Sequence, residues 1–262
     1  MLGSMLKSVS VAMITMNEAA NLPLTLASVS WASEIVIVDS GSTDTTVEIA
    51  RRFGARVIEE PWKGYAAQKN SAIEKATGDW ILSLDADEEV SAELALQIQR
   101  LMAGEAAFTA YEIPRLNHFM GRALRHGGYW PDPKLRLFRK GAARFEERPV
   151  HETLKAEGPV GRLKGHLIHQ CYRTLEEYIA HMNRYSSEGA RMLADSGRTS
   201  DSWGAFVWNA VLNPAATFVY NYVFRLGFLD GREGLIQHLN HSVYIHWKFV
   251  KAGKGEEQGT RD

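Results

Sequence analysis

The stretch that decides the fold is Gly78-Asp79-Trp80-Ile81-Leu82-Ser83-Leu84-Asp85-Ala86-Asp87-Glu88-Glu89. Residues 80–84 have the length and the near-continuous hydrophobicity of a parallel strand that is buried on both faces. The apolar run stops at Asp85, so Asp87 falls in the turn beyond the carboxyl end of this strand. In open α/β sheets, ligands bind at that edge.

Two carboxylates one residue apart repel each other unless a cation or hydrogen-bond donors hold them. Oxygen ligands suit Mg²⁺ or Mn²⁺, and Mg²⁺ typically takes one or two protein carboxylates and fills its shell with substrate phosphates. The same pattern is typical of a solvated acidic turn before a helix, because Asp and Glu stabilise the first helical turn. The Asp-x-Asp pair alone does not decide between a metal site and such a turn.

Composition is that of a globular protein able to bury a core: 262 residues, of which 45% are hydrophobic and 23% charged. Residues 1–110 hold 8 Lys/Arg and 15 Asp/Glu, whereas residues 111–262 hold 22 and 16. This asymmetry predicts an acidic half that can hold a metal and a basic half that can face an anionic acceptor or surface. A single cysteine, Cys171, and an N-terminus without a signal-peptide core favour the cytoplasm.

Strands and helices alternate before the central stretch. We expect strands at 9–16, 34–38 and 55–58. We expect helices at 20–28 and 66–76, and between them a helix that begins after the Ser42–Asp44 segment and ends at Phe53. This alternation predicts a parallel sheet with helices on both faces. Ser42, Thr43 and Asp44 are N-cap candidates for the second helix, and Gly78 is a C-cap candidate for the third.

Three of the expected strands end in polar side chains at the same rim of the sheet. The clusters are Thr15, Asn17 and Glu18; Asp39, Ser40 and Ser42; and Asp85 and Asp87. Helix capping explains single residues among them, but not why all three clusters fall on the carboxyl edge. Lys69 adds a cation on the helix that enters the central strand, unless it is a solvated surface lysine.

Four segments in this order, Ile14–Glu18, Val38–Asp44, Gln68–Asn70 and Leu84–Glu88, together resemble glycosyltransferase family 2. These are inverting nucleotide-sugar transferases of GT-A fold, so the resemblance implies a Rossmann-like α/β mixed sheet flanked by helices. It also implies a nucleotide site, usually for uridine diphosphate, in which Asp87 ligates the divalent metal. The implied nucleotide-binding residues are Thr15, Asn17, Glu18, Asp39, Ser42, Lys69 and Asp85. No G-x-x-x-x-G-K-[ST] motif is present, so metal and side chains must hold the phosphates.

The second half begins with expected strands at 111–115 and 134–139, and nine Lys/Arg fall between Arg115 and Arg148. Nucleic-acid binding is one interpretation of this charge, but a sequence pI of 6.8 and the absence of an RNA-binding motif argue against it. A phosphate-bearing sugar acceptor or an anionic membrane surface fits better.

Inverting transfer needs a group that takes the proton of the acceptor hydroxyl. Glu152, beside His151, is the candidate base, and similar family 2 enzymes carry a His-Glu pair at this place; an exposed structural glutamate is the alternative. Asp132, Glu146 and Glu147 are reserve candidates. Many GT-A enzymes supply a further metal ligand from a downstream histidine, so His169 or His151 is a candidate ligand, although either can also be a satisfied core residue.

The C-terminal part is expected to be helical, with helices over 175–193 and from about residue 232 to Lys251. Residues 203–224 carry no formal charge and are rich in aromatics. They are long enough to span a bilayer, but their polar residues argue against spanning. Docking at the membrane interface and burial as a core or oligomer helix remain the other two interpretations.

The whole arrangement resembles the subgroup that adds glucose to the heptose region of the lipopolysaccharide core. We therefore expect a metal-dependent transferase that uses a UDP-hexose, a lipid-linked saccharide acceptor and Mg²⁺ or Mn²⁺, peripheral on the cytoplasmic face of the cell membrane. The expected division is a nucleotide-sugar half at 1–105, an acceptor half at 106–172, a helical membrane-associating extension at 173–252 and a disordered tail at 253–262. The alternatives are a polyprenyl-phosphate acceptor, a non-catalytic nucleotide-sugar-binding protein and a nucleotidyltransferase.

Overall fold

The structure is a computed structural model, and it describes residues 7–146, 153–197 and 202–252. The chain divides into two compact units. The first comprises Met1–Leu116 and Pro131–Gln170, and the second Asn117–Trp130 and Cys171–Asp262.

Strands and helices alternate at the start of the first unit, as the sequence predicts. In chain order they are β1 (Val9–Thr15), α1 (Leu22–Ser28), β2 (Glu34–Asp39), α2 (Thr46–Arg52), β3 (Arg56–Glu59), α3 (Tyr65–Lys75), β4 (Trp80–Ser83), β5 (Glu88–Val90) and α4 (Ala92–Ala103). The later strands are β6 (Ala110–Phe119), β7 (Arg122–Ala123), β8 (Asp132–Arg139), β9 (Ala143–Glu146), β10 (Thr153–Ala156), β11 (Val160–Arg162) and β12 (Leu167–Tyr172).

The main sheet has the strand order β3-β2-β1-β4-β8-β6-β12-β5. The first four of these strands are parallel, with β1 central between β2 and β4. Next to β4, strand β8 runs antiparallel, and so does β12 against β5. The expected mixed sheet is therefore confirmed, and its parallel half is the part that the sequence pattern predicts.

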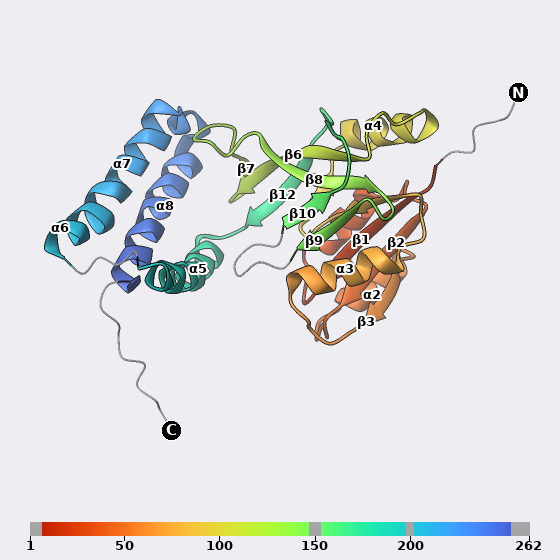
Figure 1. Cartoon of the computed structure of the whole chain (residues 1–262), viewed down its shortest axis with the longest axis horizontal. Coiled ribbons are helices and arrows are strands. Elements are labelled where there is room, and N and C mark those ends of the chain that lie inside the picture. The colour runs from red at the N-terminus through yellow and green to blue at the C-terminus, as the bar shows by residue number, and fades with distance from the viewer. Residues whose placement is uncertain (1–6, 147–152, 198–201, 253–262) are drawn as a thin grey trace, which may run out of the picture. The chain divides into compact units, whose positions relative to one another are not determined.

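Helices cover both faces of the parallel half. Alternate residues of β1 point into two different cores: Val11 and Met13 pack in one core with Leu26 of α1, and Ala12 packs in the other with Ala72 of α3. Figure 1 shows α3 lying over the β1–β2 part of the sheet. The near-continuous apolar run of β4 is explained in the same way, because Trp80 and Leu82 serve the first core and Ile81 the second.

Two cap predictions are wrong. The N-cap residue of α2 is Thr45, and Asp44 instead accepts the backbone N–H of Thr46 from one position further out. Helix α3 ends at an extended Ala76, so Gly78 does not cap it. Gly78 is needed for a different reason: a Cβ there would lie 2.8 Å from the backbone nitrogen of Ser10, so only glycine allows β1 to approach this closely.

The second unit is mainly helical. It contains α5 (Leu175–Asp195), then α6 (Trp203–Phe206), η1 (Val207–Leu212), α7 (Asn213–Val219) and η2 (Tyr220–Phe224) in direct succession, and finally η3 (Gly227–Asp230) and α8 (Gly231–Ala252). A capping box between Thr174 and Glu177 starts α5. In the described ranges, no helix combines the length and the apolarity required to cross a bilayer.

Asp230 fixes a loop of the second unit. Its buried carboxylate accepts the backbone N–H groups of Arg125 at 3.1 Å and of His126 at 2.9 Å, and it lies 2.7 Å from His126 Nδ1. Asp230 therefore has a structural role, because it anchors the start of the loop that continues through Gly127, Gly128, Tyr129 and Trp130.

Candidate active site

Asp39, the last residue of β2, organises the loop that follows it. Its Oδ1 accepts the N–H groups of Gly41 and Ser42 at 3.0 and 2.8 Å, and its Oδ2 accepts the hydroxyls of Thr15 and Ser42 at 2.7 and 2.6 Å. Burial alone would raise the pKa of Asp39, but these four hydrogen bonds hold it below its ordinary value. Thr15, Asp39 and Ser42 thus form one ionised, rigid unit at the ends of β1 and β2.

The segment after β1 is attached to the same loop. Asn17 has a left-handed φ of 58°, which Asn tolerates better than most residues. Its N–H donates to Ser42 Oγ at 2.9 Å, and its Oδ1 accepts the N–H of Thr43 at 2.8 Å. The N–H of Glu18 donates to Thr46 Oγ1 at 2.8 Å. The first two polar clusters therefore meet, as the sequence predicts.

Glu18 links these two clusters to the third. Burial raises the pKa of its carboxyl group, a hydrogen bond from Asn21 opposes that shift, and the negative charges of Asp87 and Asp85 add to it. Glu18 therefore feels the negative charge of Asp87, and the two carboxylates share this edge.

The turn between the two aspartates of the central stretch is held rigidly. The N–H of Glu88 donates to the carbonyl of Asp85 at 3.1 Å and closes the turn, and the N–H of Asp85 donates to Glu88 Oε2 at 3.1 Å. The hydroxyl of Thr25 donates to the carbonyl of Ala86 at 2.7 Å. With the backbone fixed in this way, the two aspartates have different partners.

Asp85 is neutralised by two cations. Lys69 Nζ lies 2.8 Å from its Oδ1, and Arg136 Nη2 pairs with its Oδ2. Burial by itself would raise the pKa of Asp85, but the charges of Arg136 and Lys69 hold it well below its usual range. Both neighbours of Lys69 fix α3 in place: Gln68 donates to Ser40 Oγ, and Asn70 bonds the backbone of Phe145 in both directions at 2.9 Å.

Behind Asp85 lies a buried network of alternating charges that the sequence did not reveal. Arg136 and Glu88, 5% and 0% exposed, pair at 2.6 Å, and Arg115 pairs with Glu88 at 3.2 Å. Arg115 also pairs with Asp132 at 2.8 Å, and Asp132 pairs with Lys134 at 2.9 Å. Of the nine cations between Arg115 and Arg148, for which the sequence suggests an anionic acceptor or membrane surface, Arg136 and Arg115 pair with acidic side chains of the protein itself.

Arg136→Met is expected to lower the free energy of unfolding by about 3–5 kcal/mol, because it leaves Asp85 and Glu88 without their shared buried cation. Urea unfolding followed by circular dichroism measures this. The matched control is Arg139→Met on the same strand, where an exposed guanidinium lies over the Trp80 ring and the cost should be about 1 kcal/mol or less. Equal stability of the two variants would show that the network contributes little.

Asp87 has a different environment, since its Oδ2 lies 3.2 Å from His169 Nε2. Strands β12 and β5 pair antiparallel with His169 opposite Glu88, which brings the histidine beside the turn. This 3.2 Å separation is that of a hydrogen bond. Carboxylate oxygens suit Mg²⁺ or Mn²⁺ and imidazole is a common metal ligand, so Asp87 and His169 are residues that would hold a divalent ion here. Within the described residues no three His, Cys, Asp or Glu side chains form a metal-binding group.

Of the other candidates for the base and for the metal ligand, some lie in the described ranges and some do not. Glu152, Glu147 and His151 lie outside the described residues, so their roles stay predictions. Glu146 is on β9, where it pairs with Lys155 at 2.7 Å. Lys134 and Arg115 lower the pKa of Asp132 against the effect of its burial, which makes this reserve candidate a weaker proton acceptor.

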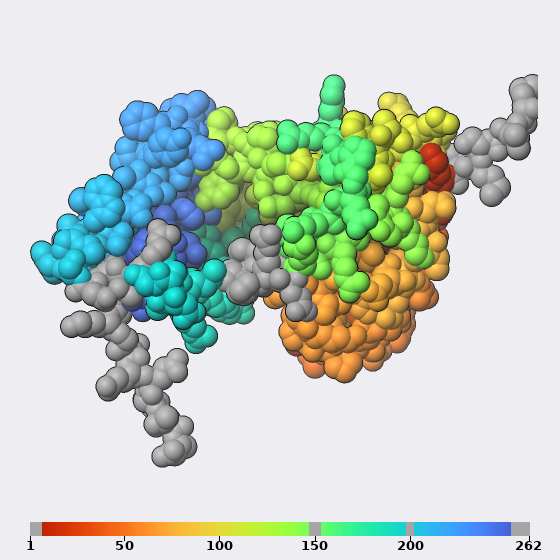
Figure 2. All heavy atoms as spheres, viewed as in Figure 1, coloured from red at the N-terminus to blue at the C-terminus, as the bar shows by residue number. Residues whose placement is uncertain are grey.

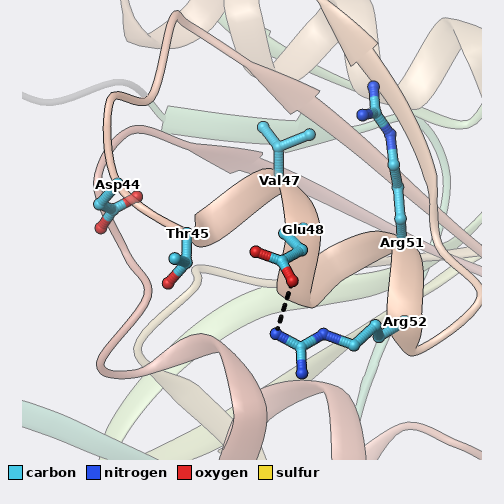
Figure 3. Close-up of a pocket in the computed structure, with 6 residues that line it drawn as sticks. All are labelled: Asp44, Thr45, Val47, Glu48, Arg51 and Arg52. Carbon is cyan, nitrogen blue, oxygen red and sulfur yellow. Dashed lines mark hydrogen bonds and ion pairs between the residues drawn. The ribbon is translucent and has the colours of Figure 1, made fainter.

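A depression lies along the start and the length of α2. Figure 3 shows its six lining residues, Asp44, Thr45, Val47, Glu48, Arg51 and Arg52, along one turn-and-helix segment. Glu48 and Arg52 form an i, i+4 ion pair at 3.1 Å, and both side chains are more than 60% exposed. Such a pair is a solvated surface feature of little energetic weight.

Comparison with known proteins agrees with this geometry. The family described as "Glycosyl transferase family 2" matches residues 10–153. The lipopolysaccharide core biosynthesis glycosyltransferase LpsC of Rhizobium meliloti is 31% identical, with 94% of this chain and 90% of LpsC covered. An uncharacterized glycosyltransferase of Rickettsia felis is 34% identical, with 96% and 90% covered.

Among solved structures, the fold is similar to that of the mannosyltransferase PcManGT from Pyrobaculum calidifontis, whose structure is a complex with GDP-Man and Mn²⁺. The TM-score is 0.54 at 17% identity, with 94% of this chain and 87% of that one covered. The family match covers the ends of β1, β2 and β4 and the turn with Asp85 and Asp87, but not β12, which carries His169. The chain therefore belongs to glycosyltransferase family 2, an inverting hexosyltransferase family with the GT-A fold.

Proposed function

We propose that the protein moves a hexose, with glucose as the expected sugar, from a UDP-sugar to a hydroxyl of a lipid-linked saccharide. The observation that carries this proposal is that Asp85 and Asp87, the two aspartates of the central turn, have different partners. Asp85 is already neutralised by Lys69 and Arg136, whereas Asp87 lies 3.2 Å from His169, so these two groups would be the ones to hold a cation. A nucleoside diphosphate is a ligand that needs such a cation, because its leaving group carries several negative charges.

On the donor side, Asp87 and His169 would hold a divalent ion that supplies Lewis-acid stabilisation of the departing diphosphate. Lys69, 11% exposed beside Asp85, adds a fixed positive charge at this edge. Thr15, Asn17, Glu18, Asp39 and Ser42 shape the loops that would receive the nucleobase and ribose. The carboxylate of Asp39 accepts four hydrogen bonds from the protein, so its proposed role is to hold that loop in place as an ionised side chain.

On the acceptor side, Glu152 would take the proton of the attacking hydroxyl while the diphosphate leaves in line. No covalent enzyme intermediate is required, since inversion takes a single displacement. We assign the nucleotide-sugar half to residues 1–105 and the acceptor half to residues 106–172.

The acceptor is proposed to be the heptose region of a lipopolysaccharide core. Support comes from the likeness to LpsC along nearly the whole of both chains, since that protein is described as acting in lipopolysaccharide core biosynthesis. A lipid-linked acceptor implies that the protein works as a peripheral protein at the cytoplasmic face of the cell membrane.

A donor screen tests the proposal. Purified protein with Mn²⁺ and extracted lipid-linked core saccharide is expected to release UDP from UDP-glucose faster than from other UDP- or GDP-sugars. Both substrates should be required, so UDP release should fall to background without the acceptor. Release of pyrophosphate would identify a nucleotidyltransferase, and binding of UDP-glucose without turnover on any acceptor would identify a binding protein.

A further inference from the structure

The helical stretch 203–224 exposes large apolar side chains along its length. Trp203 is 79% exposed, Trp208 63%, Tyr220 58% and Phe224 73%. Figure 2 shows the atoms of this stretch, in light blue, at the surface of the C-terminal helices. Single exposed apolar residues are ordinary, but a continuous apolar face on a helix marks a surface that meets another apolar phase.

The polarity of this stretch is inverted relative to a helix that faces water. The outward positions include Trp208, Val211, Leu212, Val219, Tyr220 and Phe224. The polar residues Asn209, Asn213, Thr217 and Asn221 recur every four positions and are half-buried instead. A helix packed on a globular core in water has its apolar stripe inward and its polar face outward.

Helix α8 covers the inner side of this stretch. Ala210 and Pro214 are buried there, and their carbonyl oxygens meet His246 Nδ1 at 2.6 Å and the Ser242 hydroxyl at 2.7 Å. Figure 1 shows α7 and α8 side by side. The inner face of the stretch is thus covered by α8, and its outward apolar face is the one that is exposed.

The charge on this face is positive. Between Ser202 and Leu229 the only charged residue is the exposed Arg225, and it is followed by the buried Asp230, the exposed Arg232 and the half-buried Glu233. Lys251 of α8 does not extend this charge, because its ammonium is held by Asn183, Ser186 and Ser187 of α5. An apolar face rich in Trp and Tyr, with an exposed arginine and no acid within it, is complementary to an anionic lipid surface.

We infer that residues 203–229 form a lipid-contacting face that lies in the plane of an anionic membrane surface, with Trp203, Trp208, Tyr220 and Phe224 at the headgroup level. This inference rests on the proposed function, whose lipid-linked acceptor lies in a membrane, and it names the surface that contacts that membrane. A second copy of the chain fits less well. Protein interfaces carry about one hydrogen bond per 100–200 Å² of buried area, and apart from Arg225 the exposed side chains named for this face offer only the N–H of Trp and the O–H of Tyr.

Flotation of the full chain with vesicles tests the inference. We expect the protein to float with vesicles of phosphatidylethanolamine and phosphatidylglycerol and much less with neutral phosphatidylcholine vesicles. The double variant Trp208→Ser with Phe224→Ser should lose at least tenfold in vesicle partition. The matched control is Trp62→Ser with Tyr65→Ser, a pair of aromatics in the first unit that are 48% and 61% exposed; it should partition like the wild type.

A nitroxide label reports the depth of the face directly. With Cys171 replaced by serine, a label at Leu212→Cys should become accessible to oxygen and shielded from a water-soluble nickel reagent when vesicles are added. A label at Leu96→Cys, at an exposed leucine of α4, should stay in water. Equal accessibility at both positions, or a dimer that the Trp208 and Phe224 variant dissociates in the absence of lipid, would overturn the inference.

These outcomes are separable from a failure of the proposed function. The Trp208 and Phe224 variant should keep wild-type affinity for UDP with Mn²⁺, and Asp87→Ala should keep wild-type vesicle partition. Vesicle binding without any UDP affinity would refute the donor proposal alone, whereas UDP affinity without vesicle binding would refute the lipid face alone.

Discussion

Asp87→Ala is expected to lower sugar transfer by on the order of 10³-fold and to abolish the dependence of UDP binding on Mn²⁺. The reason is that Asp87 is the carboxylate of the central turn that has no cationic Lys or Arg partner among the ion pairs of the described residues. A metal that stabilises a leaving diphosphate contributes several kcal/mol to the transition state, and about 4 kcal/mol corresponds to that change in rate. Initial rates with saturating donor and calorimetric titration of UDP measure the two effects.

The control for this variant is Glu89→Ala. Glu89 carries the same charge two residues further on, and its Oε1 accepts a 3.3 Å hydrogen bond from Gln170. We expect both its turnover and its UDP affinity to stay within a few-fold of wild type. If the two variants lose activity equally, the effect of Asp87 is one of general charge at this edge, and its assignment as a metal ligand is wrong.

Glu152→Gln is expected to lower turnover by about 10²- to 10⁴-fold, the range typical of a general base, while UDP affinity stays unchanged. The substitution keeps the shape of the side chain and removes only its ability to take the acceptor proton. Turnover at saturating concentrations of both substrates measures the loss, and calorimetry measures UDP binding.

Glu146→Gln is the matched control, because Glu146 is an exposed carboxylate that is paired with Lys155 on the neighbouring strand. Its activity should remain close to that of the wild type. A loss of less than tenfold for Glu152→Gln would favour the polyprenyl-phosphate alternative, in which the attacking oxygen is already anionic and needs no base. Loss of UDP affinity in the same variant would indicate that Glu152 supports the donor site.

The parallel half of the sheet follows from the sequence because its signals are local. The strands β1, β2 and β4 are short apolar runs that end in polar residues, and two cores on opposite faces explain why these runs do not alternate. The convergence of Thr15, Asn17, Asp39 and Ser42 also follows, since parallel strands bring their carboxyl ends to one edge.

The supporting network of the site does not follow from the sequence, because its partners are far apart in the chain. Arg136 and Glu88 are separated by 48 positions, and Arg115 and Glu88 by 27. In the sequence, Arg136 is one cation of a basic strand, and only the antiparallel pairing of β8 with β4 brings it behind the central turn. The placement of His169 beside Asp87 likewise depends on a long-range register, that of β12 on β5.

The environment of residues 203–224 does not follow from the sequence either. Their lack of charge is visible in the sequence, but spanning, interfacial docking and burial all explain it. Which side of the helix is covered depends on packing against α8, through Ser242 and His246. Once that side is known, the half-buried row of Asn209, Asn213, Thr217 and Asn221 shows that the apolar side faces out.

The most direct test of the central claim, that a divalent ion at Asp87 bridges the protein to the diphosphate of the donor, is a calorimetric titration of the wild-type protein with UDP. UDP is expected to bind at least about tenfold more tightly with Mn²⁺ than with EDTA, a difference of about 1.4 kcal/mol or more. Mn²⁺ alone is expected to bind weakly if Asp87 and His169 are its proposed ligands and the donor diphosphate completes the site. Equal UDP affinity with Mn²⁺ and with EDTA would contradict the account.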